Sequence, residues 1–160
     1  SRQDTSYKMI RPMTAQDIPV LLVLGAEMHK ESRYANLDFD PQKLWQLGET
    51  MLGNPEAWLA LVVERDGDII GFCCGYVAPH FFGNELTSGD LAIYVVPEHR
   101  GGTIGARLVK KYTAWCEAQG VREPLLGVSA GITPDRTGQL YERLGYTEKY
   151  TIYKKPIFVI

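Results

Sequence analysis

A glycine-rich turn at residues 100–106 has the composition of an anion-binding site. It reads RGGTIGA and follows an apolar run that ends at Pro97. If a helix begins at this turn, the unpaired N–H groups of its first turn and the positive end of its dipole favour a phosphate. Glycine lets the backbone approach phosphate oxygens closely, and Arg100 can add a charge-assisted contact. The alternative is that these glycines only make a tight turn, because short glycine turns are common.

Two common nucleotide-binding turns do not fit this stretch. A P-loop requires lysine and then serine or threonine after its last glycine, whereas Gly105 is followed by Ala106 and Arg107. A dinucleotide-binding turn follows the first strand of its domain and precedes an acidic residue about 20 positions later, at the end of a second strand. The pattern therefore favours neither kind of nucleotide site.

The elements around the turn are expected to position it. Residues 91–96 (LAIYVV) form a near-continuous apolar run, which is typical of a strand covered on both faces. A helix from Gly101 to Gly120 should follow, and residues 125–129 predict another short strand. Strand, helix and strand would then form a right-handed crossover with parallel strands. A further helix over 134–144 should end at Gly145.

The first half of the chain predicts two more helices and three more strands. A strand at 7–11 precedes a helix that begins near Thr14 and Asp17 and reaches about residue 30. Asp40-Pro41 starts a second helix that ends near residue 53. Asp66-Gly67 predicts a hairpin between strands 58–64 and 69–77. Residues 146–160 alternate well enough for one or two closing strands, and no internal repeat or linker interrupts the chain.

Composition and charge exclude several classes of protein. The 160 residues are 45% hydrophobic and 22% charged, as expected of one globular domain. With 17 basic and 19 acidic side chains the net charge is −2, so nucleic acid is not the expected main partner. No run of about 18 apolar residues predicts a membrane span. Three cysteines without metal-ligand spacing suggest no metal site and a reducing, cytoplasmic location.

The turn and a second motif together resemble the Gcn5-related N-acetyltransferase (GNAT) family from about residue 7 to residue 153. In that family a strand ending in Val-x-Pro precedes Arg or Gln, two variable residues, Gly, any residue, and Gly or Ala. The turn at 100–105 matches this order, although Thr103 stands where the family usually has its middle glycine. A family helix ends in Leu-Tyr-x-x-x-Gly-Phe, which matches 140–146 (LYERLGY). The asparagine often found before that tyrosine is replaced here by Pro134-Asp135.

The resemblance implies a fold and a way of binding acetyl-CoA. The fold would be an α+β domain over 1–160, with a mixed, mostly antiparallel sheet of about six to seven strands and about four helices on its two faces. Acetyl-CoA would lie between strands 91–96 and 125–129, which splay apart. The pantetheine arm would pair with the backbone of Ile93, Tyr94 and Val95. The pyrophosphate would be bound by Arg100, Gly101, Gly102, Thr103, Ile104, Gly105 and Ala106.

The resemblance also implies direct transfer of an acetyl group to a primary amine, in a small molecule or a protein, within a ternary complex. Tyr141 is the expected general acid for the departing CoA thiolate, because the ordinary pKa of a phenol, near 10, is matched to that of a thiol. The amine must lose a proton before it attacks. Asp90 and Glu85 are the candidate bases, with His80 and Ser129 as alternatives, and their spacing does not choose among them.

Substrate recognition in this family usually falls to the segment between the first two helices and to the loop before the central strand. Here these are residues 31–39 and 79–88, whose side chains suit a cationic amine with an apolar body. The relevant aromatic and acidic residues are Tyr34, Phe39, Phe81, Phe82, Glu31, Asp38 and Glu85.

The last residues of the sequence bear on how the chain assembles. Residues 156–160 (PIFVI) are apolar to the last position, which predicts a paired strand or a homodimer contact.

An alternative function is a catalytically weak or inactive acyl-CoA-binding regulatory module. Thr103 and the missing asparagine favour that alternative, whereas Tyr141 in its motif favours catalysis.

Overall fold

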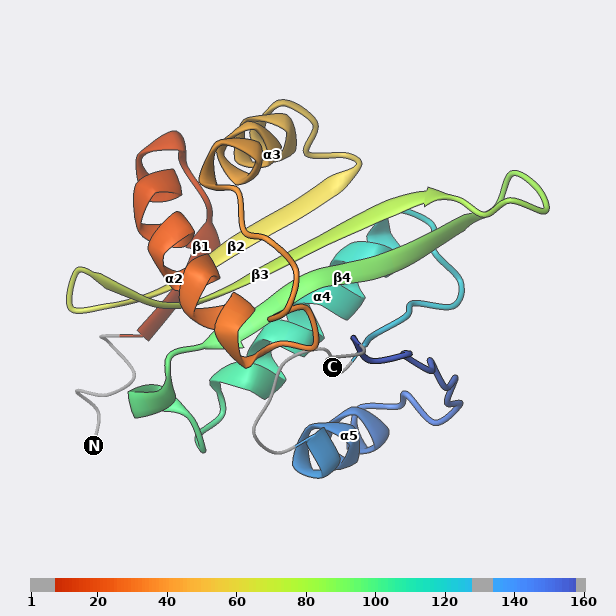
Figure 1. Ribbon diagram of the computed structural model, residues 1–160. Helices are drawn as coiled ribbons and strands as arrows, with labels where there is room; N and C mark the ends of the chain where they lie inside the picture. The colour runs from red at the N-terminus through yellow and green to blue at the C-terminus, as the bar shows by residue number, and fades with distance from the viewer. Residues whose placement is uncertain (1–7, 128–133, 158–160) are drawn as a thin grey trace.

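A four-stranded sheet forms the centre of the molecule (Figure 1). The computed structural model describes residues 8–127 and 134–157. The strands lie in the order β1-β2-β3-β4, and each neighbouring pair is antiparallel. Asp66 and Gly67 turn the β2–β3 hairpin with φ angles of 52° and 84°, the positive values that a type I′ turn needs. The strands are β1 (Lys8–Pro12), β2 (Trp58–Arg65), β3 (Asp68–Pro79) and β4 (Leu86–Val95).

Helices cover both faces of this sheet. Helices α2 (Ile18–Glu31) and α3 (Pro41–Gly53) lie over one face and α4 (Ile104–Ala118) over the other, with α5 (Pro134–Arg143) beyond α4 (Figure 1). Short 3₁₀ helices, η1 (Ala15–Asp17) and η2 (Pro97–His99), precede α2 and α4. The prediction of four α-helices on two faces is confirmed. Among the described residues, no helix has the length and apolar character needed to cross a membrane.

Each face of the sheet has its own apolar core. Val62 and Val63 are both fully buried, because successive strand residues point to opposite faces. Val63 packs in the cluster that contains Leu108 and Tyr112 of α4, and Val62 packs in the cluster of α2 and α3. The three cysteines are unpaired thiols, and burial raises the pKa of Cys74 to about 12, so this thiol stays protonated.

The predicted cap at the start of the first helix is confirmed. Thr14 and Asp17 form a capping box, and the Thr14 backbone N–H donates to Asp17 Oδ2 at 2.7 Å. Arg11 of β1 donates to both Asp17 oxygens at 2.8 and 2.9 Å. These hydrogen bonds lower the pKa of Asp17 to about 2 although the carboxylate is buried. The pair therefore fixes the first turn of α2 against the sheet edge.

The prediction of a mixed sheet with six to seven strands is wrong. The described residues contain four strands and no parallel pair. Residues 125–127 run beside β4 without a backbone ladder, because the amides of Leu125 and Gly127 bond side-chain oxygens of Ser88 and Asp90 instead. Residues 128, 129 and 158–160, also predicted as strand, lie outside the described residues.

The closing strands predicted within 146–160 are absent from residues 146–157. Tyr150, Ile152 and Tyr153 are 76%, 74% and 91% exposed, so neither face of this segment packs on the sheet. A strand needs both a ladder partner and a buried face, and this segment has neither in the described chain.

Two element starts also differ from the predictions. Strand β4 begins at Leu86, five residues before the apolar run, because residues 86–90 pair with 75–79 despite their polar side chains. Helix α4 begins at Ile104 and not at Gly101, whose φ of 94° lies in the left-handed region and cannot continue a right-handed helix.

Candidate active site

A bulge in β4 places polar side chains of this strand on the α4 side of the sheet. Ala92 lies opposite Cys74 and Asp90 lies opposite Gly75, so Leu91 is the extra residue between them. Beyond the bulge, Ile93 packs against the apolar cluster that contains Leu108 and Tyr112 of α4. Without the extra residue, Asp90 would point to the other face, because strand side chains alternate. The bulge therefore turns Asp90 toward α4 and α5.

Asp90 and Tyr141 meet at the peptide groups of Gly127. The Gly127 N–H donates to Asp90 Oδ1 at 2.8 Å, and the Tyr141 hydroxyl donates to the Gly127 carbonyl at 3.2 Å. Burial raises the pKa of Asp90 to about 6, although hydrogen bonds and the charge of Arg33 act in the opposite direction. Burial, with the nearby Asp90 charge, raises the pKa of Tyr141 above its ordinary value. The site thus holds a carboxyl group that titrates near neutrality beside a protonated phenol.

A second hydrogen-bonded group holds residue 125 against β4. The Tyr112 hydroxyl donates to the Leu125 carbonyl at 2.6 Å and lies 2.8 Å from Ser88 Oγ. Ser88 Oγ in turn accepts from the Leu125 N–H at 3.1 Å. Gly75 leaves room for this tyrosine, because a Cβ there would lie 2.7 Å from Tyr112 Cε1. Sequence reasoning missed Ser88 and Tyr112 as site residues, since neither belongs to a motif.

We expect Tyr112→Phe to lower the free energy of unfolding by about 1–3 kcal/mol, because the Leu125 carbonyl and the buried Ser88 hydroxyl lose a partner. Urea denaturation measures this change. Tyr76→Phe is the matched control, since the Tyr76 hydroxyl has no hydrogen-bond partner in the described part of the chain. Equal stability of Tyr112→Phe and Tyr76→Phe would contradict the role given to Tyr112.

The free edge of β4 offers two of the three backbone positions predicted to bind the pantetheine arm. The Val96 N–H donates to Ile70 of β3 at 2.9 Å, so it points into the sheet. Because N–H and C=O groups alternate in direction along a strand, Val95 and Ile93 point outward and Tyr94 points inward. The Val95 carbonyl indeed accepts from a side chain outside the sheet, Arg100 Nε, at 2.7 Å. Tyr94 contributes a buried ring to the core, being 4% exposed.

The glycine turn precedes α4 with open space around it. A Cβ at Gly101 or Gly102 would meet no atom of residues 8–127 or 134–157 within 4 Å. Thr103 occupies the N-cap position but its side chain makes no capping hydrogen bond. The Arg107 N–H donates to the Thr103 carbonyl at 3.0 Å, so the amides of residues 104–106 precede the first bond of the helix. The Ile104 side chain is buried, which leaves Ile104, Gly105 and Ala106 to act through their backbone.

Arg100 is bound to residues other than the glycine turn. Its Nη2 donates to both Glu31 carboxylate oxygens, at 2.9 and 3.2 Å, and its guanidinium carbon lies 5.2 Å from the centroid of the Tyr94 ring. Tyr94 belongs to the core of α2 and α3. Arg100 therefore connects the end of α2 to the end of β4 and is not turned toward the first amides of α4.

The other predicted bases lie apart from Asp90 and Tyr141. Glu85 forms an exposed ion pair with Arg122 at 3.0 Å, near the tip of the β3–β4 hairpin. His80 Nδ1 accepts from the Phe82 N–H at 3.1 Å within the same loop. Ser129 lies outside the described residues. Within residues 8–127 and 134–157, no group of three or more His, Cys, Asp or Glu residues could hold a metal ion.

Comparison with solved structures shows that the chain has the fold of known acetyltransferases. Glucosamine-6-phosphate N-acetyltransferase from Arabidopsis thaliana has a TM-score of 0.73 at 15% identity, covering 94% of this chain and 99% of that one. Ribosomal-protein-alanine N-acetyltransferase from Brucella melitensis biovar Abortus 2308 gives 0.69 at 21%, covering 94% and 99%. An aminoglycoside N-acetyltransferase in complex with CoA gives 0.71 at 18%, covering 94% and 96%.

The sequence itself places the chain within one family of this fold. A model of the acetyltransferase (GNAT) family matches residues 25–146, which is more than half of the chain. The protein therefore belongs to the GNAT family of acetyltransferases. No curated protein matches its sequence.

Proposed function

We propose that the chain is an N-acetyltransferase that moves the acetyl group of acetyl-CoA directly to a primary amine in a ternary complex. The observation that carries this proposal is the meeting of Asp90 and Tyr141 at Gly127, beside the bulged edge of β4. A carboxylate and a phenol are the base and acid that such a transfer needs. Residues 1–160 would form a single acyl-CoA N-acyltransferase domain.

The proposed steps account for both protons that the substrate nitrogen loses: one passes to the leaving thiolate by way of Tyr141, and one is released. Asp90 accepts a proton from the ammonium form of the substrate, directly or through one water. The neutral nitrogen attacks the thioester carbonyl carbon, and an outward N–H of β4, at Ile93 or Val95, stabilises the charge that develops on the carbonyl oxygen. The carbon–sulfur bond then breaks, and Tyr141 donates its proton to the leaving thiolate. The nitrogen gives its second proton to the Tyr141 phenolate, directly or through one water, and Asp90 releases the first proton to solvent. Burial of Tyr141 keeps its pKa raised, so the proton is present at neutral pH.

The residues present fit acetyl-CoA in two places. The outward backbone groups of Ile93 and Val95 can pair with an extended pantetheine arm as an added strand would. The amides of residues 104–106 and the open turn at Gly102 can accept the pyrophosphate, with Thr103 as a further donor. Arg100 could join them only after release from Glu31. The CoA complex of the aminoglycoside N-acetyltransferase of the same fold supports this assignment.

A melting curve with and without acetyl-CoA tests the binding claim. At a concentration of about 100 times its dissociation constant, the ligand should add about 2.7 kcal/mol of stability and raise the melting temperature. Gly102→Val should abolish most of this gain, because its side chain would occupy the open turn without meeting other atoms. Gly53→Val is the matched control, since a Cβ at Gly53 also meets nothing within 4 Å. No stabilisation of the unaltered chain at millimolar acetyl-CoA would contradict the proposal.

A regulatory acyl-CoA-binding module is the second candidate. The engagement of Arg100 by Glu31 favours it, because a family arginine is then withheld from the turn. A module of this kind would show the same stabilisation by acetyl-CoA without releasing thiol in the presence of any amine.

The cysteines and the exposed apolar side chains of residues 152–157 bear on the location and assembly of the protein. Three unpaired cysteines favour a reducing, cytoplasmic location. The exposed apolar side chains of Ile152, Tyr153 and Ile157 favour a homodimer that covers this segment. Light scattering on the purified chain distinguishes a dimer from a monomer.

A further inference from the structure

We propose that the acceptor is an amine with an apolar body, and that this body binds in a cavity between α2, α3 and the sheet. The inference rests on the proposed function and names the acceptor class for that site. The cavity has a volume of about 440 Å³, which lies within the range of small-molecule sites. Its lining comes from α2, residues 32–40, α3, β3 and the bulge of β4.

The cavity reaches from the solvent to the strand at which transfer is proposed. Tyr34, Asp38 and Asp40 are exposed lining residues, so they mark one opening at the segment between α2 and α3. Leu91, the extra residue of the bulge, also lines the cavity and is 41% exposed. Leu91 adjoins Asp90 in the chain. Asp90 lies on the α4 side of β4, so a ligand that fills the cavity and extends past Leu91 brings its amine to the edge of this strand, where transfer is proposed.

The walls between these openings are mostly hydrocarbon, and His29 and Ser32 are their polar members. Leu21 and Leu22 of α2, Leu47 of α3 and Phe39 line the cavity together with Phe72 of β3. Hydroxyl groups of a ligand would find few partners there, and a buried polar group without a hydrogen bond costs free energy. An amino sugar is therefore a poor fit, whereas an alkyl or aryl chain buries its surface favourably.

The charges at the solvent opening favour a cation and oppose a phosphate. The lining contains the carboxylates of Asp38 and Asp40, and Lys43 is its only lysine or arginine within the described chain. Asp40 accepts from the amides of Gln42 and Lys43 as the N-cap of α3. Asp38 has no hydrogen-bond or ion-pair partner among the described residues, so its charge is available to an entering ammonium group.

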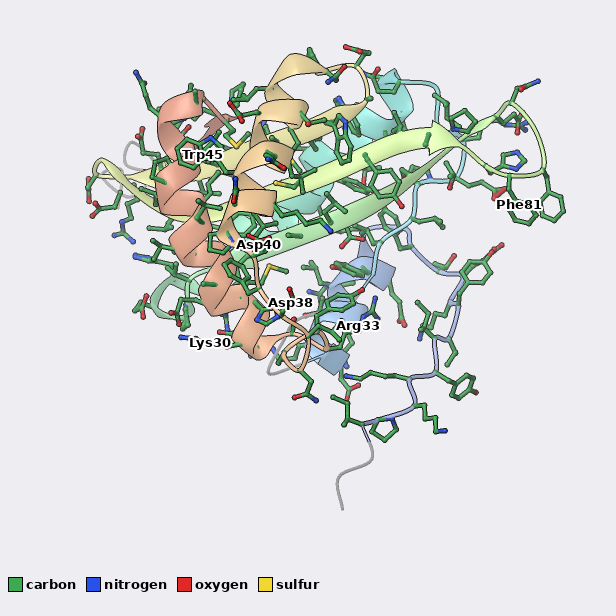
Figure 2. All side chains as sticks on the ribbon, turned by 45° about the horizontal axis from the view of Figure 1, so that its top comes forward. Lys30, Arg33, Asp38, Asp40, Trp45 and Phe81 are labelled. Atoms are coloured by element: carbon green, nitrogen blue, oxygen red, sulfur yellow. The ribbon has the colours of Figure 1, made fainter. Side chains whose placement is uncertain are left out.

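The aromatic hairpin tip does not take part in this site. Phe81 and Phe82 are 89% and 82% exposed, and their ring centroids lie 3.9 Å apart. Figure 2 shows Phe81 at the far end of the β3–β4 hairpin, away from Asp38 and Arg33. Of the two segments predicted to recognise the acceptor, only residues 31–39 line the cavity.

A series of straight-chain amines from propylamine to hexylamine tests the proposal on the unaltered protein. Each added methylene should raise kcat/KM about threefold to fourfold until the cavity is full. Hexylamine and phenethylamine should exceed glucosamine 6-phosphate at least tenfold. A flat series, or preference for the amino sugar or for a lysine peptide, would overturn the inference while leaving the proposed function intact.

A variant that fills the cavity provides a second test of the proposed acceptor site. Gly25 lines the cavity, and a Cβ there would lie 4.0 Å from the Phe39 ring, an ordinary contact. Gly25→Leu should therefore fold, keep its stabilisation by acetyl-CoA, and lose at least tenfold in kcat/KM for hexylamine. Val23→Leu, on the exposed side of the same helix, is the control and should lose nothing.

Three further results would overturn the inference in different ways. Unchanged kcat/KM for hexylamine in Gly25→Leu would exclude the cavity as the acceptor site. Turnover of hexanoyl-CoA that falls in Gly25→Leu, while hexylamine transfer does not, would assign the cavity to the acyl chain of the donor. Absence of stabilisation of the unaltered chain by acetyl-CoA would remove the proposed function and this inference with it.

Discussion

Tyr141→Phe should lower kcat for acetyl transfer by about 100-fold or more while leaving acetyl-CoA binding nearly unchanged. The substitution removes the proton that the leaving thiolate needs, and general acid catalysis typically contributes 10²–10⁴ in rate. The ring remains in place, and within the described part of the chain the substitution removes one hydrogen bond, to the Gly127 carbonyl. Steady-state thiol release, with the acetyl-CoA melting shift measured in parallel, gives both quantities.

Tyr146→Phe is the matched control for this prediction. Its ring centroid lies 6.3 Å from that of Tyr141, and its hydroxyl is hydrogen-bonded to Thr113 of α4. Loss of that hydroxyl removes a partly buried hydrogen bond but no proposed proton donor. If both variants lose kcat equally, Tyr141 has a packing role only.

Asp90→Asn should lower kcat/KM by about 100-fold or more and remove the acid limb of its pH profile. In the unaltered protein, burial raises the pKa of Asp90 to about 6. Activity should therefore fall as the pH drops through 6, because the protonated carboxyl group cannot accept a proton. A rate profile from pH 5 to 8 measures the limb, and a profile without a limb near pH 6 would contradict the assignment.

The same substitution should make the protein more stable at neutral pH. The pKa of Asp90 is raised from 3.8 to about 6 on folding, so the folded state binds a proton more tightly than the unfolded state. Stability is then lost as the pH rises from about 4 to about 6, and Asp90→Asn should restore about 3 kcal/mol at pH 7 but little at pH 4. Higher stability together with lower activity is the signature of a functional buried carboxylate.

Glu85→Gln provides the control for both effects. The Glu85–Arg122 pair is exposed on both sides, and such pairs contribute little to stability. We expect unchanged stability and kcat/KM within about twofold, since exposed surface changes rarely matter more. A loss of activity in Glu85→Gln comparable to that in Asp90→Asn would transfer the base assignment to the hairpin.

The sequence predicted those parts of the fold that have strong local signals. Capping residues at Thr14 and Asp40, the Asp66-Gly67 turn and the glycine after α5 marked element ends correctly, because each acts through its nearest neighbours. In α4, Leu108, Tyr112 and Cys116 recur every four residues, as expected of one buried helix face, and all three are buried. A family motif made Tyr141 the candidate acid, and Asp90 was one of several candidate bases near the central strand, without a measure of its separation from Tyr141.

The remaining features depend on contacts that no local pattern encodes. The strand predicted at 125–129 has the right apolar residues, but the amides of Leu125 and Gly127 bond Ser88 and Asp90, 37 residues earlier in each case. The bulge at Leu91 interrupts no recognisable motif, yet it decides which face Asp90 occupies. The partner of Arg100 is Glu31, which lies 69 residues away, so sequence reasoning could assign the arginine only by its place in the turn.

The most direct test of acetyl transfer uses acetyl-CoA labelled in its acetyl group. The label is followed first with the protein alone and then with the amine series added. The proposed mechanism predicts that no label stays on the protein without amine, and that the label appears on hexylamine at a rate that Tyr141→Phe and Asp90→Asn both reduce. Acetyl-CoA that stabilises the protein but yields no labelled amine with any member of the series would contradict catalysis and favour the regulatory module.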